Sequence, residues 1–308
     1  MNPAALLIIN PLHKTNKFSK KSKTHFSLLY THYIYKSVIF VKNKQENNYM
    51  SVITLTTDWG QKDYYRAAVV GKLLSQNPKL QIIDISHNVA NHNFMQAAFI
   101  LENAYKNFPS GSIHIIGVDA IPSDKKPHTL DKANGHYFIA ADNGIFSLLF
   151  DEKDDIEKII QIDIIQDSDY YTFPERDVFA KVALHINDKK DIEELGDVIT
   201  KFREALPHKP TIAHNSVSGV VLYIDTYNNA ITNLSLHKLQ DKLNKNFTIS
   251  FGKYKITEIH DSYDDVPEGE MLALFGSNGL LQIALNKDNA NKLLGLRERT
   301  VIRIDFEN

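Results

Sequence analysis

The feature that most constrains the fold is a regular alternation of apolar strand patterns and amphipathic helix patterns that starts at residue 51. Strand patterns cover 51–57, 80–85 and 112–118. Apolar residues at helical spacing cover 63–76 and the segment that follows Asn93, a suitable helix cap. Strands that alternate with helices favour right-handed crossovers and a mainly parallel sheet. We therefore predict an α/β sandwich for this part of the chain.

The alternation continues to about residue 186 and then stops. A fourth strand pattern covers 135–141, and a helical pattern covers 176–186. Residues 206–216 have the polar, proline-containing composition of a linker. We place the N-terminal α/β domain at 51–207 and the linker at 208–216.

The last third of the chain is rich in short apolar runs separated by turn residues. These runs lie at 219–224, 247–251, 271–275, 280–284 and 301–306. Strands at this spacing suggest an antiparallel barrel or sandwich. We predict that residues 217–308 form a smaller C-terminal antiparallel β-barrel domain.

Residues 1–50 differ from the rest of the chain in composition. They contain eight lysines and one glutamate, and both of their apolar runs are shorter than the roughly 18 residues of a membrane span. Lysines follow the first apolar run, whereas a secretory signal has its basic residues in front. Because a strand pattern begins directly after Met50, we interpret 1–50 as a basic extension upstream of the true translation start. A targeting or nucleic-acid-binding arm is the alternative.

Charge and cysteine content exclude several classes of function. Beyond residue 50 the chain carries 27 basic and 36 acidic side chains, a net formal charge of −9. Nucleic-acid binding depends on Lys and Arg neutralising phosphates, so an acidic body disfavours that partner. The absence of cysteine excludes disulfides and cysteine nucleophiles, and it suits a cytoplasmic location. We expect a small-molecule ligand, with no nucleic acid and no membrane as partner.

Polar residues terminate consecutive strands of the predicted parallel sheet. Asp58, His87 and Asp119 follow the first three strands, and Asp142 with Asn143 follows the fourth. Ligands of open α/β sheets bind outside the carboxyl ends of the strands. The alternative is that these residues cap helices or order turns, as Asp and Asn commonly do.

A second group, Asp84, His87 and His92, has the residue types of a metal site. Zinc requires three or four ligands in fixed geometry. Asp84 and His87 on one strand would point to opposite faces of the sheet. We expect no metal here and interpret His92 as a wall or hydrogen-bond partner of a ligand pocket, with a metal-dependent hydrolase as a lesser alternative.

The C-terminal part contains two further polar motifs. Asp225, Tyr227 and Asn229 combine a carboxylate, an aromatic ring and an amide, and Asn278 lies in a second motif at 275–286. This combination suits a polar amphiphile such as an amino acid or a nucleoside, although asparagines are equally good turn residues. The chain lacks the Walker loop, GxGxxG, HExxH and GxSxG, which favours a phosphate-free ligand.

Seven blocks of the sequence, in order, resemble one family, the S-adenosylmethionine hydroxide adenosyltransferases, which are relatives of the bacterial fluorinase and chlorinase. The blocks are TTDWG (56–60), DISHNVANHNFMQAA (84–98), FPSGSIHIIGVD (108–119), ADNG (141–144), TFPERDVFA (172–180), DTYNNAITN (225–233) and GSNGLLQIALN (276–286). The resemblance implies the two domains predicted above. It also implies a homotrimer, with substrate bound between one subunit's first domain and its neighbour's second.

The resemblance assigns roles to residues of this chain. Asp58 would bind the ribose hydroxyls, and His92 would lie beside the nucleoside. The backbone near Asn286 would contact the adenine. Asp225 and Asn229, with Ser277, would hold the methionine portion. Asn143, Tyr227 and Asn278 are further candidate substrate-binding residues. The family reaction uses S-adenosylmethionine as its substrate and needs no cofactor or metal, since water or hydroxide attacks the ribose C5′ and methionine leaves as a neutral thioether.

The sequence departs from the family at the residues that activate water. Hydrolases of the family resemble one another in an Asp, Arg, His triad. This chain keeps the Asp as Asp119, but the Arg position falls on Lys126 or, with one gap, Lys125, and the His position is Pro174. Proline cannot relay a proton, and lysine lacks arginine's planar fork. We hypothesise that the adjacent Glu175 takes over as base or water anchor, while Lys125 or Lys126 holds Asp119.

These observations favour a hydrolase that converts S-adenosylmethionine to adenosine and L-methionine. The long fluorinase loop is not found after Asp119, and a carboxylate at 175 would repel halide, so a halogenase is disfavoured. The alternative from another class is a non-catalytic relative that binds S-adenosylmethionine or adenosine.

Overall fold

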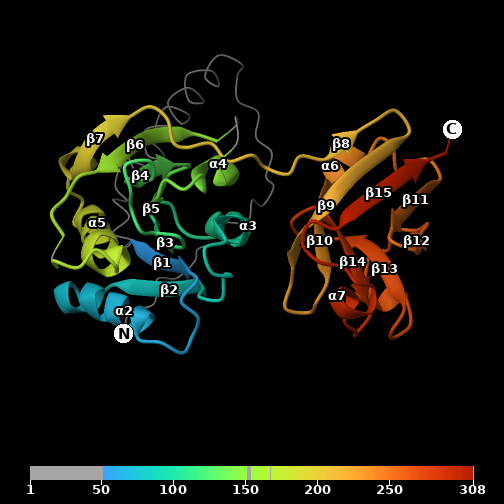
Figure 1. Cartoon of the computed structure of the whole chain (residues 1–308), viewed down its shortest axis with the longest axis horizontal. Coiled ribbons are helices and arrows are strands. Elements are labelled where there is room, and N and C mark those ends of the chain that lie inside the picture. Colours follow the sequence, from blue (N-terminus) through green and yellow to red (C-terminus); the bar gives the residue numbers. More distant parts are fainter. Residues whose placement is uncertain (1–50, 151–153, 167, 308) are drawn as a thin grey trace, which may run out of the picture. The chain divides into compact units, whose positions relative to one another are not determined.

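The computed structural model describes residues 51–150, 154–166 and 168–307. The basic extension, and with it the predicted translation start at Met50, lies outside the described residues. The described part contains two sheets (Figure 1). The strands of the first sheet precede residue 205 in the sequence, and the strands of the second follow it. None of the helices in this part has the length and apolar character that a membrane span requires.

The first sheet has seven strands in the order β2-β1-β3-β5-β4-β6-β7. Its strands are β1 (Val52–Thr57), β2 (Gln81–Ser86), β3 (Ile113–Gly117), β4 (His128–Ala133), β5 (His136–Ala141), β6 (Ile156–Ile162) and β7 (Gly196–Ile199). β2, β1, β3 and β5 pair in parallel, whereas β4, β6 and β7 extend the sheet antiparallel. The predicted parallel sheet is therefore confirmed for its first four strands, and the antiparallel extension was not predicted.

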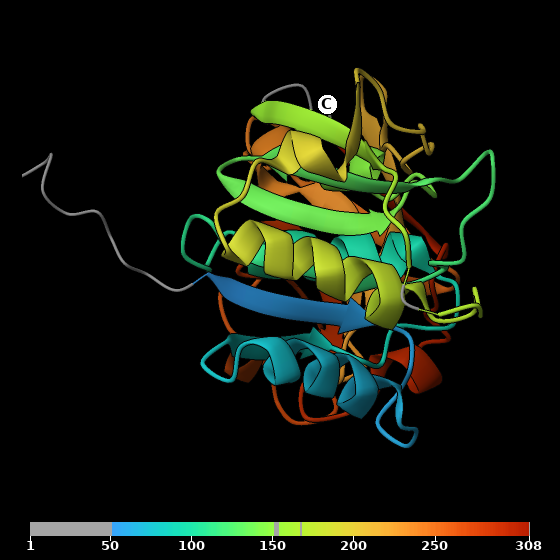
Figure 2. The same cartoon turned by 90° about the vertical axis from the view of Figure 1, so that its left-hand side faces the viewer.

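Helices cover both faces of this sheet. They are α2 (Tyr65–Gln76), α3 (Phe94–Tyr105), α4 (Phe146–Leu149), the π-turn η1 (Glu175–Phe179), α5 (Ala180–Asn187) and the 3₁₀ turn η2 (Ile192–Leu195). Figure 2 shows α2 and α5 lying side by side in front of the strands. Residues such as Leu73 and Val182 pack there against Leu55 and Ile115. On the opposite face, α3 and α4 pack against a cluster that includes Phe138.

Local sequence signals set the ends of these helices. Asn93 caps α3, since its side chain accepts a hydrogen bond from the backbone of Gln96 at 3.1 Å. α2 ends at Gln76, before Asn77 and Pro78, because a residue before proline is biased away from the helical region. The helix predicted at 176–186 instead begins with the wider π-turn η1 and continues as α5. π-turns are rare and often occur at functional sites.

The second sheet is antiparallel throughout, in the order β12-β11-β15-β9-β10-β14-β13, with β8 paired to β9. Its strands are β8 (Thr211–Ile212), β9 (Ser216–Ile224), β10 (Ala230–Ser235), β11 (Phe247–Phe251), β12 (Tyr254–Ile256), β13 (Met271–Phe275), β14 (Leu280–Leu285) and β15 (Val301–Phe306). The short helices α6 (Leu236–Leu239) and α7 (Ala290–Leu293) and the 3₁₀ turn η3 (Tyr263–Asp265) connect them. The end strands β12 and β13 contact each other, so the sheet closes into a near-barrel, as predicted. β8 lies within the segment predicted as a linker.

A histidine pair is buried under α3 and carries a stability prediction. Nδ1 of His114 lies 2.7 Å from Oγ1 of Thr54, and its Nε2 lies 3.2 Å from Nδ1 of His136. Burial, with His136 as a second cause, lowers the pKa of His114 to about 3.

The unfolded chain therefore binds more protons than the folded chain between pH 6.5 and about 3, and acid must destabilise the fold. We expect the free energy of unfolding to fall by roughly 1.4 kcal/mol per pH unit in this window. Urea titrations of the wild type and of His114→Gln would measure it, and an equal slope in both proteins would contradict it.

Candidate functional site

The carboxyl ends of the parallel strands bring several predicted residues together. Asp58 follows β1, and its backbone N–H donates to the carbonyl of Gly117 at the end of β3. The backbone N–H of His92 donates to Oδ2 of Asp58 at 2.8 Å. His92 has a positive φ of 61°, a conformation that is uncommon for a residue with a side chain. The loop after β2 is thus fastened to the carboxylate at the end of β1.

Glu175, at the start of η1, lies against the same strand end. Its side chain is buried, with 5% exposure. A Cβ added at Gly117 would lie 2.8 Å from its Oε1, so a larger residue at 117 would displace the carboxylate from this position. Burial, with the charge of Asp58 as a smaller cause, raises the pKa of Glu175 to about 7. A carboxylate with such a pKa can exchange a proton near neutral pH, as a general base must.

Asp119 is held by Lys126. The Lys126 ammonium donates to Oδ1 of Asp119 at 2.7 Å and to its backbone carbonyl at 3.0 Å. Asp119 has a positive φ of 47°, and strained residues of this kind cluster at functional sites. Lys126 is brought back by the turn in which Ser123 and Lys126 exchange two backbone hydrogen bonds. Lys125 is exposed, so Lys126 is the lysine that holds this carboxylate.

Asn143 and Asp142 have mainly internal partners in the structure. The Asn143 amide donates to the carbonyl of Val118 and accepts from the backbone of Ile145, each at 3.1 Å. Both carboxylate oxygens of Asp142 accept from the one backbone N–H of Arg203. The bonds of Asn143 fix the turn after β5 next to the end of β3. Its role in substrate binding stays a prediction.

The structure corrects the geometry expected for Asp84 and His87. Because β2 ends at Ser86, His87 lies beyond the strand, and side-chain alternation does not separate it from Asp84. Nε2 of His87 lies 3.1 Å from Oδ1 of Asp84 without hydrogen-bond geometry. His92 does not join them. Within 51–150, 154–166 and 168–307, no three His, Asp or Glu side chains are placed to hold a metal ion.

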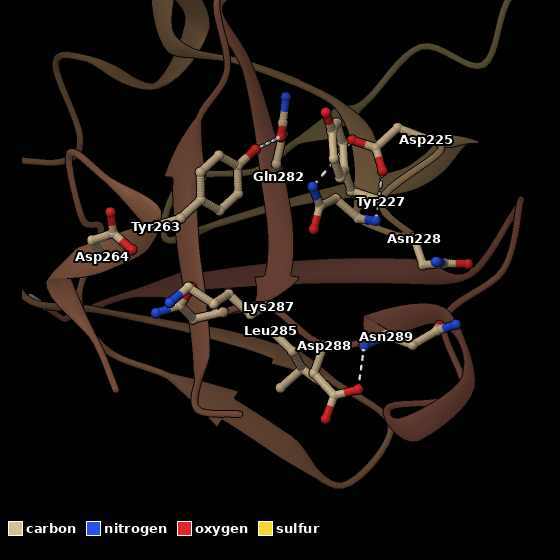
Figure 3. A pocket seen from close by; sticks show the side chains of 12 residues that line it. Asp225, Tyr227, Asn228, Tyr263, Asp264, Gln282, Leu285, Lys287, Asp288 and Asn289 are labelled. Atoms are coloured by element: carbon tan, nitrogen blue, oxygen red, sulfur yellow. Dashed lines mark hydrogen bonds between the residues drawn. The ribbon is translucent and has the colours of Figure 1, made fainter. Parts of the chain in front are cut away.

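A cavity of about 840 Å³ opens on the C-terminal sheet (Figure 3). Its lining includes four of the predicted residues, namely Asp225, Tyr227, Asn229 and Asn286. Asp225 accepts from both the backbone and the side-chain amide of Asn229, at 2.8 and 3.1 Å. Ser277 and Asn278 do not line the cavity, since they are exposed in the turn between β13 and β14.

The cavity also contains residues that sequence reasoning missed. Tyr263 donates to Oε1 of Gln282 at 2.8 Å, and Figure 3 shows this pair at one side of the cavity. Gln282 interrupts the apolar run LLQIAL of β14, and this signal could have identified it. Asp264 and Asp288 add negative charge opposite the single Lys287 among the lining residues. The acidic lining suits a cationic ligand.

Two domain descriptions match the chain. The SAM hydroxide adenosyltransferase N-terminal domain matches residues 53–196, and the C-terminal domain of the same family matches residues 219–303. Both parts of the candidate site fall within these matches.

Named relatives and solved structures agree with these matches. A protein of Methanocaldococcus jannaschii named (R)-S-adenosyl-L-methionine hydrolase is 32% identical over 260 residues, which cover 80% of this chain and 93% of the relative. A Thermus thermophilus protein of the same name is 27% identical and covers 83% of this chain and 100% of the relative. The crystal structure of an uncharacterised conserved protein from Thermotoga maritima superposes with a TM-score of 0.75 at 28% identity, covering 82% of this chain and all of that one.

Proposed function

The chain belongs to the SAM hydroxide adenosyltransferase family, and from this membership and the buried Glu175 we propose that it is an enzyme that hydrolyses S-adenosylmethionine to adenosine and L-methionine. Water forms a bond to the ribose C5′, and the C5′–sulfur bond breaks. The electron pair of that bond stays on sulfur, so methionine leaves as a neutral thioether and needs no general acid. The water proton goes to a base on the protein.

Glu175 is the observation that carries this proposal. The family's histidine position is Pro174, which cannot accept a proton, but the next residue is a buried carboxylate beside Asp58. We assign Glu175 as the base, Asp58 as the ligand of the ribose hydroxyls and Asp119 as a second contact for the attacking water. His92, fastened to Asp58, would flank the nucleoside. Desolvation of Glu175 strengthens it as a base near neutral pH.

The C-terminal cavity would bind the methionine part of the substrate. Asp225, Asp264 and Asp288 would attract the ammonium and sulfonium charges, and Asn229 is held in place by Asp225. The backbone N–H of Asn286 donates to the carbonyl of Glu270, and its carbonyl accepts from the N–H of Gly269. An adenine contact there would therefore use a neighbouring backbone group or the second lone pair of the Asn286 carbonyl.

We propose a homotrimer in which the N-terminal residues of one copy and the C-terminal cavity of its neighbour form one site. Two variants that are each inactive, Glu175→Gln and Asp225→Asn, would then regain partial activity when refolded together, because some mixed interfaces carry both intact halves. Light scattering would give the mass of the assembly. Failure of the mixture to regain activity in a mixed trimer would place the whole site within one copy.

Incubation of the purified protein with S-adenosylmethionine, followed by chromatography for adenosine and methionine, tests the reaction. Both sulfonium epimers belong in the assay, because the relatives' names specify the (R) form. Binding without adenosine release would favour a non-catalytic S-adenosylmethionine-binding protein. A 5′-halogenated nucleoside formed in the presence of chloride would favour a halogenase, and loss of activity in chelator would favour a metal-dependent hydrolase.

The two lysines near Asp119 provide a matched pair of variants. We expect Lys126→Met to lower kcat/KM about 10- to 100-fold, because a hydrogen bond to a charged group contributes about 1.5 to 3 kcal/mol. We expect Lys125→Met to have little effect, since its side chain is exposed. Steady-state kinetics of both variants would measure the difference, and equal losses would remove the assignment of Lys126.

A further inference from the structure

Trp59 is the only tryptophan of the 308 residues, and it lies beside Glu175. It follows Asp58 at the end of β1. Its ring stacks on His87 with centroids 5.9 Å apart and an angle of 12°, and it meets the edge of Phe173 at 5.8 Å. The indole is thus held between a residue that follows β2 and a residue just before η1.

The supporting histidine is itself fixed by polar contacts. Nδ1 of His87 lies 2.6 Å from Oγ1 of Thr57, and its Nε2 faces Asp84. Asp84 is in turn bound by Arg66, whose Nε donates to Oδ2 at 2.6 Å. The His87 side chain is completely buried. A ring that is buried, stacked and contacted at both nitrogens offers the indole little freedom to rotate.

The indole reaches the carboxylate directly. The Trp59 side chain lowers the pKa of Glu175, as a hydrogen-bond donor does, and the indole N–H is its only polar group. A Cβ at Gly117 would lie 2.8 Å from Oε1 of Glu175 and 3.0 Å from the Trp59 ring. Indole, carboxylate and the Gly117 backbone therefore pack together without room for another side chain.

We propose that Trp59 is a positioning residue for Glu175: its N–H holds the carboxylate in one orientation toward the attacking water, and His87, fixed by Thr57 and Asp84, holds the indole. This role rests on the proposed function, because positioning matters only if Glu175 is the base. The contact itself exists whether or not the protein hydrolyses anything, and it can be measured without substrate.

Two side chains besides the indole bear on how Glu175 titrates. Asp58, after β1, raises its pKa, and the indole N–H lowers it because a donor stabilises the charged form. Tyr65, on α2, interacts with the charge of Glu175. His87 faces the indole rather than the carboxylate. Removal of the indole donor should raise the pKa of Glu175.

The single tryptophan makes the contact directly observable. Fluorescence of the whole protein reports only Trp59, so a pH titration without substrate should show a transition near pH 7 as Glu175 ionises. The transition should disappear in Glu175→Gln and remain in His87→Gln, which controls for titration of the stacked ring. A transition that persists in Glu175→Gln, or no transition in the wild type, would overturn the proposal even if the protein releases adenosine.

Trp59→Phe then tests the consequence for the reaction. It keeps an aromatic ring between His87 and Phe173 but removes the N–H. We expect the acid limb of the kcat profile to move up by roughly one pH unit, because a hydrogen bond to a charged group is worth about one to two factors of ten. KM should stay nearly constant. An unmoved limb would overturn the proposal, and if the variant does not fold, the titration of the wild type and Glu175→Gln still decides it. Absence of adenosine from the wild type would instead refute the proposed function.

Discussion

Glu175→Gln should lower kcat for adenosine release by roughly 10²- to 10⁴-fold, the contribution typical of a positioned general base. Glutamine has nearly the same volume and can still accept the hydrogen bond from Trp59, but it cannot take a proton from water. KM should change little, because the substrate ligands assigned above, such as Asp58 and Asp225, remain in place. Single-turnover and steady-state assays with S-adenosylmethionine would measure the loss.

The pH dependence gives the same prediction a second readout. Glu175 must be ionised to act as a base, so kcat of the wild type should rise with pH and level off above its pKa of about 7. The residual activity of Glu175→Gln should lack this limb. Glu204→Gln is a matched control because Glu204 is exposed. Equal turnover in Glu175→Gln and the wild type would mean that another residue acts as the base. Asp119 would then be the first candidate.

Local patterns explain why much of the fold was predictable from the sequence. Three of the parallel strands, β1, β3 and β5, are buried runs followed by polar residues, and this signal needs no knowledge of distant contacts. The cap at Asn93 and the end of α2 before Pro78 are equally local. β4 was missed because its sequence HTLDKA is polar for a strand, although Asp131 within it is fully buried. Here pairing with β5 and β6 overrides local preference.

The candidate site was predictable only in part, because its decisive contacts join distant residues. The strand ends identified Asp58 and Asp119. The spacing of the sequence left Lys125 and Lys126 as alternatives, and only the structure, through the turn at Ser123, shows that Lys126 contacts Asp119. Nothing in the sequence showed that Trp59 and Glu175, which are far apart in the chain, would lie together beside Gly117. The family resemblance assigned Ser277 to the methionine portion. Ser277 and Asn278 lie exposed in the turn between β13 and β14, outside the residues that line the cavity, and their binding roles stay predictions.

Asp58→Asn should have two effects of opposite sign. The substitution removes a charged acceptor for the ribose hydroxyls, and a hydrogen bond to a charged group contributes about 1.5 to 3 kcal/mol, so kcat/KM should fall roughly 10- to 100-fold. It also removes a negative charge that disfavours ionised Glu175. The pKa of Glu175 should therefore fall, and the acid limb of the kcat profile should move to lower pH.

The acid limb should thus move to lower pH in Asp58→Asn and to higher pH in Trp59→Phe. Comparison of the two variants therefore distinguishes an electrostatic effect on Glu175 from general damage to the site. A distorted site would weaken both variants without moving the limb in opposite directions. Profiles of kcat and KM from pH 5 to 9 would show the shifts. The loop at His92 should stay in place in Asp58→Asn, because the asparagine keeps an oxygen that can accept from the backbone of His92. If the limb of Asp58→Asn stays where it is in the wild type, Asp58 does not act on the base, and its contribution is limited to binding. If KM is unchanged, Asp58 does not hold the ribose, and the carboxylate at the end of β1 serves only to fasten the loop at His92.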